Sequence, residues 1–313
     1  MDRQLSLYDW KNRLKIPERD RLLVLLAFTS VYIIWGSTYY SIKIAIATLP
    51  PFLMAATRYL IAGAILYLGA RIAGARLPSF RHWKDSAVLG FLLLLMGNGG
   101  VVWASDKLPS GIIALLITVE PIWIVLLVAL KNKGKLPDVK TILGILLGLA
   151  GTIILIFPDL GGQSQLNPGG LLAVFVSTIC WAIGSLYAVN AYSGVSIILA
   201  TAMQMLCGGA LMLLVAITRG EFIDIHPERF SVESLYAYLY LIVFGSIIGY
   251  SSYAYLLKVS SPSKVSTYAY VNPFVAVLIG SMIGDEPFTS QIGFAAILMI
   301  AGVFLVLTKN KKE

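Results

Sequence analysis

The chain has 313 residues, of which 58% are hydrophobic and 13% are charged, and its formal net charge at pH 7 is +8. A soluble domain carries about 25% charged residues, so this composition excludes an ordinary soluble globular protein. A net positive charge is also found in nucleic-acid-binding proteins, but the distribution of the basic residues along this chain argues against nucleic acid as a partner.

Ten apolar stretches follow one another along the chain. A transmembrane helix needs about 20 predominantly apolar residues, because the hydrocarbon layer is about 30 Å thick and a helix rises about 1.5 Å per residue. The candidates cover residues 22–44, 51–71, 86–105, 110–130, 139–157, 169–190, 196–217, 234–257, 262–283 and 287–308. They predict an all-α integral membrane protein of ten transmembrane helices, with no room for a separate soluble domain of ordinary size.

The basic residues predict the orientation of these helices. Of the 24 Lys and Arg residues, 19 fall in the tails and loops on one side, four fall on the other side, and Arg58 lies within a span. Lys and Arg are enriched in cytoplasmic loops. We therefore expect a multi-pass protein of the plasma (bacterial inner) membrane with both termini in the cytoplasm.

The two halves of the chain resemble each other. Four pairs of matching positions occur in the same order and are 146 to 152 residues apart: Trp35 and Trp181, Arg58 and Gln204, Glu120 and Asn272, and Gly151 and Gly302. A nearly constant offset indicates a duplication. Because each copy contains five predicted spans, an odd number, the second copy enters the membrane from the opposite side. Inverted repeats of this kind enclose the central site of many secondary transporters.

This duplication predicts five segments and a set of partners. The segments are a cytoplasmic tail (1–21), a first five-helix repeat (22–157), a periplasmic linker (158–168), a second repeat (169–308) and a cytoplasmic tail (309–313). Ten helices suffice to enclose a cavity, so we expect a monomer or a weak dimer. The expected partners are membrane lipid and a small-molecule substrate.

Two charged residues, Arg58 and Glu120, are predicted to lie deep in the hydrocarbon, where a charge costs about 2.5–3.5 kcal/mol on insertion scales. One interpretation is that they neutralise each other. The other is that Arg58 binds a substrate carboxylate, while Glu120 binds a proton or a cationic group because burial favours the neutral carboxyl. Glu120 is therefore the candidate for proton coupling.

Helical rise places further polar and aromatic residues at a similar depth. The predicted substrate-binding site consists of Trp35, Tyr39, Arg58, Asn98, Glu120, Trp181, Gln204, Tyr268 and Asn272. Packing inside the bundle is the alternative role for its aromatic residues. Pro121 and Pro273 each remove a backbone donor and are candidate hinges, with static kinks as the alternative. The run from Gly97 to Gly100 predicts a local break in the third span.

No enzyme signature is present. The chain lacks GxxxxGK[ST], HExxH and CxxC, which would indicate nucleotide, zinc or redox chemistry. His82 and His226 lie in opposite loops, too isolated to form a metal site. We therefore expect a protein that is not an enzyme and that has no cofactor and no metal.

Several motifs resemble those of the EamA-like branch of the drug/metabolite transporter superfamily, and the resemblance covers residues 22–308. The motifs are Trp35-Gly-Ser-Thr38, Pro50-Pro-Phe-Leu-Met-Ala-Ala-Thr-Arg58, Glu120-Pro121, Asn272-Pro273 and Gly284-Asp-Glu286-Pro. The closest resemblance is to bacterial drug/metabolite exporters. It implies ten helices in two inverted repeats, an inner-membrane location and export of amino acids, metabolites or amphipathic drugs. One departure is Lys135, which stands where the second copy has Glu286.

The resulting hypothesis is a secondary transporter that exports a small organic solute by alternating access. Two alternatives remain open. One is an exchanger of phosphorylated or nucleotide-linked sugars, which would need more cationic residues in the cavity than one arginine. The other is a non-transporting membrane scaffold, which the inverted duplication does not favour.

Overall fold

The computed structural model describes residues 18–108, 113, 116–131, 138–160, 167–189, 191, 194–223, 225–283 and 290–307. Across these residues the secondary structure is helical and includes no strand. Six helical stretches in this part of the chain are long and apolar enough to cross a membrane: Arg21–Ala45, Pro51–Ile72, Phe80–Ala104, Pro168–Ala188, Ile197–Thr218 and Val232–Val259. Each agrees with a predicted span to within a few residues.

Four of these stretches correspond to single helices, and two are composite. The single helices are α2 (Glu18–Ala45), α3 (Pro51–Ile72), α9 (Pro168–Ala188) and α10 (Ile197–Thr218). The first composite span joins α4 (Phe80–Leu89), η2 (Gly90–Gly99) and α5 (Gly100–Ala104). The second joins α11 (Val232–Tyr240), η4 (Leu241–Tyr250) and α12 (Ser251–Val259), and a short turn of 3₁₀ helix, η3 (Pro227–Arg229), precedes it.

The other helices are α7 (Glu120–Lys131), α8 (Val139–Leu160), α13 (Pro262–Val265), α14 (Tyr268–Ile283) and α15 (Ser290–Leu307). They fall within or beside the remaining predicted spans, parts of which lie outside the described residues, as do the predicted linker residues 161–166. The number of ten transmembrane helices therefore stays a prediction. Large apolar side chains such as Leu68, Leu214 and Phe304 are exposed on the outer helix faces, as expected where a helix faces lipid.

The prediction of one continuous helix over 262–283 is wrong, because the chain turns at Ser266 and Thr267 between α13 and α14. The hydroxyl of Ser266 donates to the carbonyl of Ser263, and that of Thr267 donates to the carbonyl of Lys264. Such side-chain hydrogen bonds compete with the helical pattern. A second turn, at Thr118 and Val119, immediately precedes α7, where Pro121 lacks the N–H that would continue the helical ladder.

Both composite spans contain a π-helix at their centre. The expected break at Gly97 to Gly100 is therefore a wider helical turn rather than an interruption. A π-helix leaves backbone carbonyls without their usual α-helical donors, and side chains of neighbouring helices bind two of them. The Ser177 hydroxyl donates to the carbonyl of Met96 at 2.8 Å, and the Trp35 indole N–H donates to the carbonyl of Gly245 at 3.2 Å.

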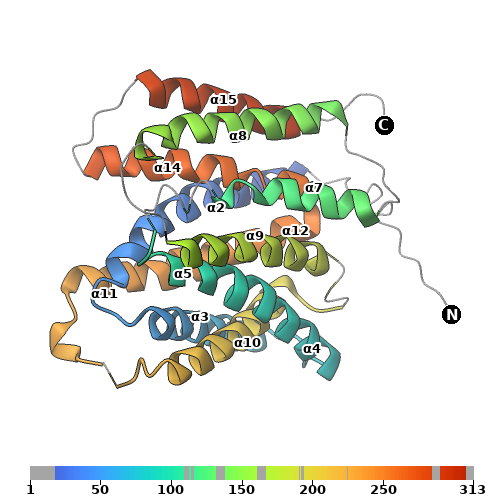
Figure 1. The fold of residues 1–313 in the computed structure, drawn as a ribbon. Coiled ribbons are helices and arrows are strands. Elements are labelled where there is room, and N and C mark those ends of the chain that lie inside the picture. The colour runs from blue at the N-terminus through green and yellow to red at the C-terminus, as the bar shows by residue number, and fades with distance from the viewer. Residues whose placement is uncertain are drawn as a thin grey trace.

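The helices pack in pairs that match between the two halves of the chain. Figure 1 shows α3 beside α10 at one edge of the molecule and α8 beside α15 at the opposite edge. Between these edges, α2 packs against η4 and α14, whereas α9 packs against η2 and α7. In addition, α3 packs against η4, and α10 packs against η2.

Polar contacts at the helix ends define two faces of the bundle. On the first, the Glu221 face, the backbone N–H of Leu53 donates to Glu221 Oε2 at 2.8 Å, which caps the N-terminus of α3 from the loop after α10. The Ser234 hydroxyl donates to the carbonyl of Ile44 there. On the second, the Asp85 face, the Tyr187 hydroxyl donates to Asp85 Oδ1 at 2.6 Å. This face carries Arg71, Arg76, Arg81, Lys84, Lys258 and Lys264.

The pair of α8 and α15 is in contact through backbone atoms. A Cβ atom added to Gly302 would lie 2.6 Å from the Gly144 carbonyl oxygen, and one added to Gly144 would lie 2.7 Å from the Gly302 carbonyl oxygen. Close approach of this kind supplies packing where lipid provides no hydrophobic driving force between helices. Gly144 and Gly148 of α8 form a GxxxG pair, and backbone atoms of both lie within 3 Å of a Cβ added to Gly302.

We predict that Gly302→Ala separates α8 from α15 and destabilises the protein by about 1–3 kcal/mol, as overpacking typically does. The measurement is the thermal unfolding midpoint in detergent. Gly69→Ala is the matched control, because no atom lies within 4 Å of the added Cβ there and alanine favours a helix over glycine. Equal midpoints for the two variants would contradict the contact.

Candidate functional site

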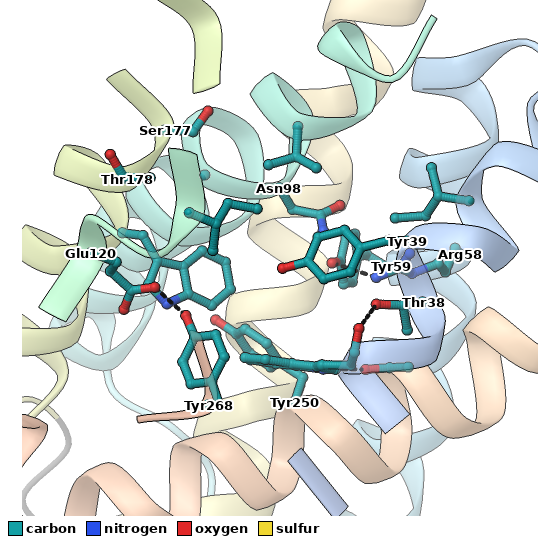
Figure 2. A pocket seen from close by; sticks show the side chains of 17 residues that line it. Thr38, Tyr39, Arg58, Tyr59, Asn98, Glu120, Ser177, Thr178, Tyr250 and Tyr268 are labelled. Carbon is teal, nitrogen blue, oxygen red and sulfur yellow. Dashed lines mark hydrogen bonds between the residues drawn. The ribbon is translucent and has the colours of Figure 1, made fainter. Parts of the chain in front are cut away.

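A cavity lies among the central helices. It is nearer the Glu221 face than the Asp85 face. It includes about 670 Å³ of space between atoms, part of it open to solvent. Its walls come from α2, α3, η2, α5, α7, α9, η4 and α14. Figure 2 shows polar and aromatic side chains converging on it from these elements. We call it the central cavity.

Seven of the nine predicted site residues line the central cavity: Trp35, Tyr39, Arg58, Asn98, Glu120, Trp181 and Tyr268. The predicted site did not include ten other residues that also line it: Thr38, Ile42, Tyr59, Gly97, Val101, Ile117, Ser177, Thr178, Gly245 and Tyr250. Several of them adjoin a predicted residue or precede one by a helical turn. Tyr59 follows Arg58, and Ser177 lies one turn before Trp181, so helical neighbours were the available signal.

Gln204 and Asn272 do not line the central cavity. The Asn272 side-chain amide donates to the carbonyls of Tyr32 and Tyr268, both at 3.1 Å, in the orientation that satisfies both of its ends. It therefore ties α14 to α2. Gln204 Oε1 accepts a hydrogen bond from the Tyr250 hydroxyl at 2.8 Å. Both amides are hydrogen-bonded to protein groups behind the cavity wall. The match between the two halves of the sequence does not reveal these bonds.

Glu120 lies at one end of the cavity, as Figure 2 shows. It is the first residue of α7, and only 2% of its surface is exposed. Its Oε2 atom accepts a hydrogen bond from the Tyr268 hydroxyl of α14, whereas its buried Oε1 atom has no protein partner. The carboxyl group is thus fixed on one side and retains an unsatisfied acceptor on the other.

Arg58 lies at the opposite end of the cavity (Figure 2) and is 3% exposed. Its Nε atom donates to the Ser246 hydroxyl at 2.8 Å and its Nη2 atom donates to the Tyr59 hydroxyl at 2.6 Å. The guanidinium carbon also lies 4.4 Å from the centre of the Tyr59 ring. The buried Nη1 atom has no protein partner. Arg58 and Glu120 therefore bind different partners and do not neutralise each other.

One more buried polar atom of the lining lacks a partner, Asn98 Oδ1, whereas the Trp181 indole N–H is directed at the Tyr253 hydroxyl. Together with Arg58 Nη1 and Glu120 Oε1, it makes one donor and two acceptors at one cavity. A buried polar group left without a hydrogen bond costs about 1–3 kcal/mol. Three such atoms at one cavity indicate that a ligand or water completes the arrangement.

Aromatic rings separate the central cavity from a second one. Trp35 contacts the rings of Trp181, Tyr253 and Tyr268 at centroid distances of 5.6, 5.0 and 5.2 Å. The Tyr253 hydroxyl also forms a hydrogen bond with the Ser185 hydroxyl. Tyr253 borders the second cavity, whose wall includes the end of α9, the beginning of α10 and the end of α12. The second cavity therefore lies toward the Asp85 face.

Comparisons with known proteins agree with a transport function. The model of the EamA-like transporter family matches residues 22–157 and 168–308. The uncharacterized inner membrane transporter YedA of Escherichia coli is 36% identical over 297 residues, covering 94% of this chain and 93% of that protein. The uncharacterized transporter YvbV of Bacillus subtilis is 26% identical, covering 94% of each chain.

A solved structure supports the fold. A crystal structure of a protein that is 20% identical in sequence superposes with a TM-score of 0.72, covering 91% of this chain and 96% of the other. The agreement extends over nearly all of both chains, so the arrangement of helices is shared although the sequences have diverged.

We predict that Tyr268→Phe destabilises the protein by about 1–3 kcal/mol, because it leaves both carboxyl oxygens of the buried Glu120 without a hydrogen bond. The thermal unfolding midpoint in detergent is the readout. Tyr187→Phe removes a hydrogen bond to Asp85 at an exposed site, so its effect stays within about 0.5 kcal/mol. A Tyr268→Phe midpoint equal to that of Tyr187→Phe would show that Glu120 does not depend on Tyr268.

Proposed function

The chain belongs to the EamA-like transporter family of the drug/metabolite transporter superfamily and is a membrane transporter, and we propose that it exports a small organic solute by alternating access. One observation carries the proposal. The residues that line a cavity inside the membrane-spanning bundle include three, Arg58, Asn98 and Glu120, that each carry a buried polar atom without a partner in the protein. Such a site is suited to a polar solute that leaves water for the duration of transport. Export, as the direction, follows from the resemblance to bacterial exporters.

The proposed site consists of the seven predicted residues that line the central cavity, with Gln204 and Asn272 acting from behind its wall. Pro121 and Pro273 remain the candidate hinges. Pro121 is the second residue of α7, beside the turn at Thr118 and Val119, and Pro273 lies inside α14. Both therefore lie on helices that carry a residue of the site.

Two inverted five-helix repeats, 22–157 and 169–308, are part of the proposal. The family model matches two successive segments of the chain with nearly these bounds. Contacts between helices have counterparts when the two halves are exchanged. The contact of α2 with η4 corresponds to that of α9 with η2, and the contact of α2 with α14 corresponds to that of α9 with α7. The central π-helices begin at Gly90 and Leu241, at the offset seen in the sequence. These matches support the repeats.

The positive-inside rule makes the basic Asp85 face the cytoplasmic one. In that orientation the central cavity serves the periplasmic side, and the second cavity serves the cytoplasmic side. The aromatic residues between them, with Trp35 at their centre, then close the cytoplasmic path in this state. A single chain surrounds both cavities, which is in keeping with transport by a monomer or a weak dimer.

The two matching tryptophans differ in a way that suits alternating access. Trp35 packs on Gly249, and Trp181 packs on Gly97; a Cβ added to either glycine would lie within 2.7 Å of the indole. Only Trp35 donates its indole N–H to a π-helix carbonyl, that of Gly245. Gly245 lies four residues before Gly249, and the residue four before Gly97 is Leu93, so we take the Leu93 carbonyl as the match for Trp181. In the opposite-facing state, Trp181 binds Leu93 and Trp35 releases Gly245.

The phosphorylated-sugar exchanger is the weaker candidate. Arg58 is the one cationic side chain among the described residues that line the central cavity, whereas a dianion would need further positive charge to offset its desolvation. A non-transporting scaffold gives no reason for three unsatisfied polar atoms around a buried cavity. Neither alternative is favoured by a specific contact.

We predict that Glu120→Gln abolishes solute flux driven by a pH gradient in proteoliposomes, because the amide cannot exchange a proton. The solute is one selected by a thermal-shift screen of metabolites and drugs on the purified protein. Asp106→Asn, which changes an exposed carboxylate outside the cavity, is the control and retains the flux. A Glu120→Gln protein whose flux still responds to pH would assign Glu120 a structural role.

We predict opposite effects for Trp35→Phe and Trp181→Phe. Each substitution removes one hydrogen bond of about 1 kcal/mol from one state only, so each changes the equilibrium between the states about fivefold. A Val101→Cys reporter in the central cavity, in a protein lacking Cys180 and Cys207, is labelled by a membrane-impermeant maleimide from the periplasmic side. Labelling slows in Trp35→Phe and does not slow in Trp181→Phe. Equal slowing would contradict the exchange.

A further inference from the structure

We propose that the central cavity binds a zwitterionic solute whose cationic and anionic groups are separated by an uncharged segment. An α-amino acid, whose two charges are attached to one carbon atom, fits this cavity less well. The inference rests on the proposed function and specifies the class of solute. It is carried by the positions of Arg58 and Glu120 and by the one unpartnered atom that each directs to the lining.

The two charged side chains are held apart by the protein. Arg58 is fixed through Nε by Ser246 of η4 and through Nη2 by the hydroxyl of Tyr59. Glu120 is fixed through Oε2 by Tyr268 of α14. Figure 2 shows the two groups at opposite ends of the cavity with Asn98 between them. Because each is anchored to a different helix, they cannot approach each other without losing these bonds.

Charge balance then selects the ligand. A charge in a low-dielectric interior is costly unless it is paired. A carboxylate at Arg58 Nη1 and an ammonium group at Glu120 Oε1 pair both side chains at once, and the complex gains no net charge. A monocation leaves Arg58 unpaired, and a monoanion leaves Glu120 unpaired unless that carboxyl is protonated.

The middle of the cavity determines what joins the two charges. Trp35, Tyr39 and Tyr250 contribute aromatic rings to its wall, and such rings favour apolar or flat groups. Asn98 Oδ1 is one acceptor in this stretch, so the segment carries at most a few donors. The cationic end of the solute and a proton compete for the same oxygen of Glu120, which couples their movements.

The test uses the purified full-length protein and straight-chain ω-amino acids from glycine to 8-aminooctanoate. Binding is measured by calorimetry, alongside alkylamines and alkyl carboxylates of the same lengths. Affinity is expected to reach a maximum at an intermediate chain length, about tenfold or more above both glycine and the matched single-charge compounds. A series without a maximum, or α-amino acids that bind as tightly as the best ω-amino acid, would overturn the inference.

Conservative variants separate recognition from folding. Glu120→Asp withdraws the carboxylate by one methylene and is expected to move the optimum to a ligand about one methylene longer, whereas Asp106→Asn leaves it unchanged. Arg58→Gln is expected to lose about tenfold in affinity for the best ω-amino acid while still binding the alkylamine. An optimum that does not move in Glu120→Asp would contradict direct contact with the cationic end.

The proposed function is tested separately. Proteoliposomes are assayed for flux of single-charge solutes selected by thermal shift. If such flux occurs without any preference for separated charges, the inference fails and the transport proposal stands. If no solute moves under any gradient, the proposed function fails as well.

Discussion

A polar group placed in hydrocarbon must find a partner within the protein or in a ligand, because no water is available to replace it. This constraint organises the structure. Most polar groups in the described spans bind a neighbour: the π-helix carbonyls of Met96 and Gly245 accept from Ser177 and Trp35, and Asn272 binds two carbonyls. Around the central cavity the same requirement is left partly unmet, and that difference marks the site.

Most of the helical architecture follows from simple features of the sequence. Long apolar stretches predict spans because few other structures bury twenty apolar residues, and the six described long spans agree with them. The irregular places were less predictable. The turn at Ser266 and Thr267 depends on hydroxyls bonding to backbone, and the π-helices depend on tertiary contacts. Neither leaves a pattern in hydropathy.

The lining of the central cavity was predicted in outline. Deep charges such as Arg58 and Glu120 are conspicuous because their cost demands a function, and both line the cavity. Assigning a residue to the site because it stands at the matching position of the other half was less reliable. Gln204 occupies the position matching Arg58 but borders the second cavity, as the proposed inversion of the two halves would require, since it places matching residues on opposite sides of the centre. Which other residues reach the cavity depends on side-chain rotamers and hydrogen bonds, which the sequence does not specify.

The pair of α8 and α15 contributes no described residue to either cavity. It touches the remainder chiefly through α14, where the ring of Tyr270 packs on Gly148. In the proposed mechanism, selectivity and assembly are consequently governed by different parts of the molecule. Substitutions in α8 and α15 that keep small residues where the two helices touch can accumulate without altering which cargo is chosen. The residues that line the cavity can likewise change toward new cargo while the packing of α8 on α15 remains intact.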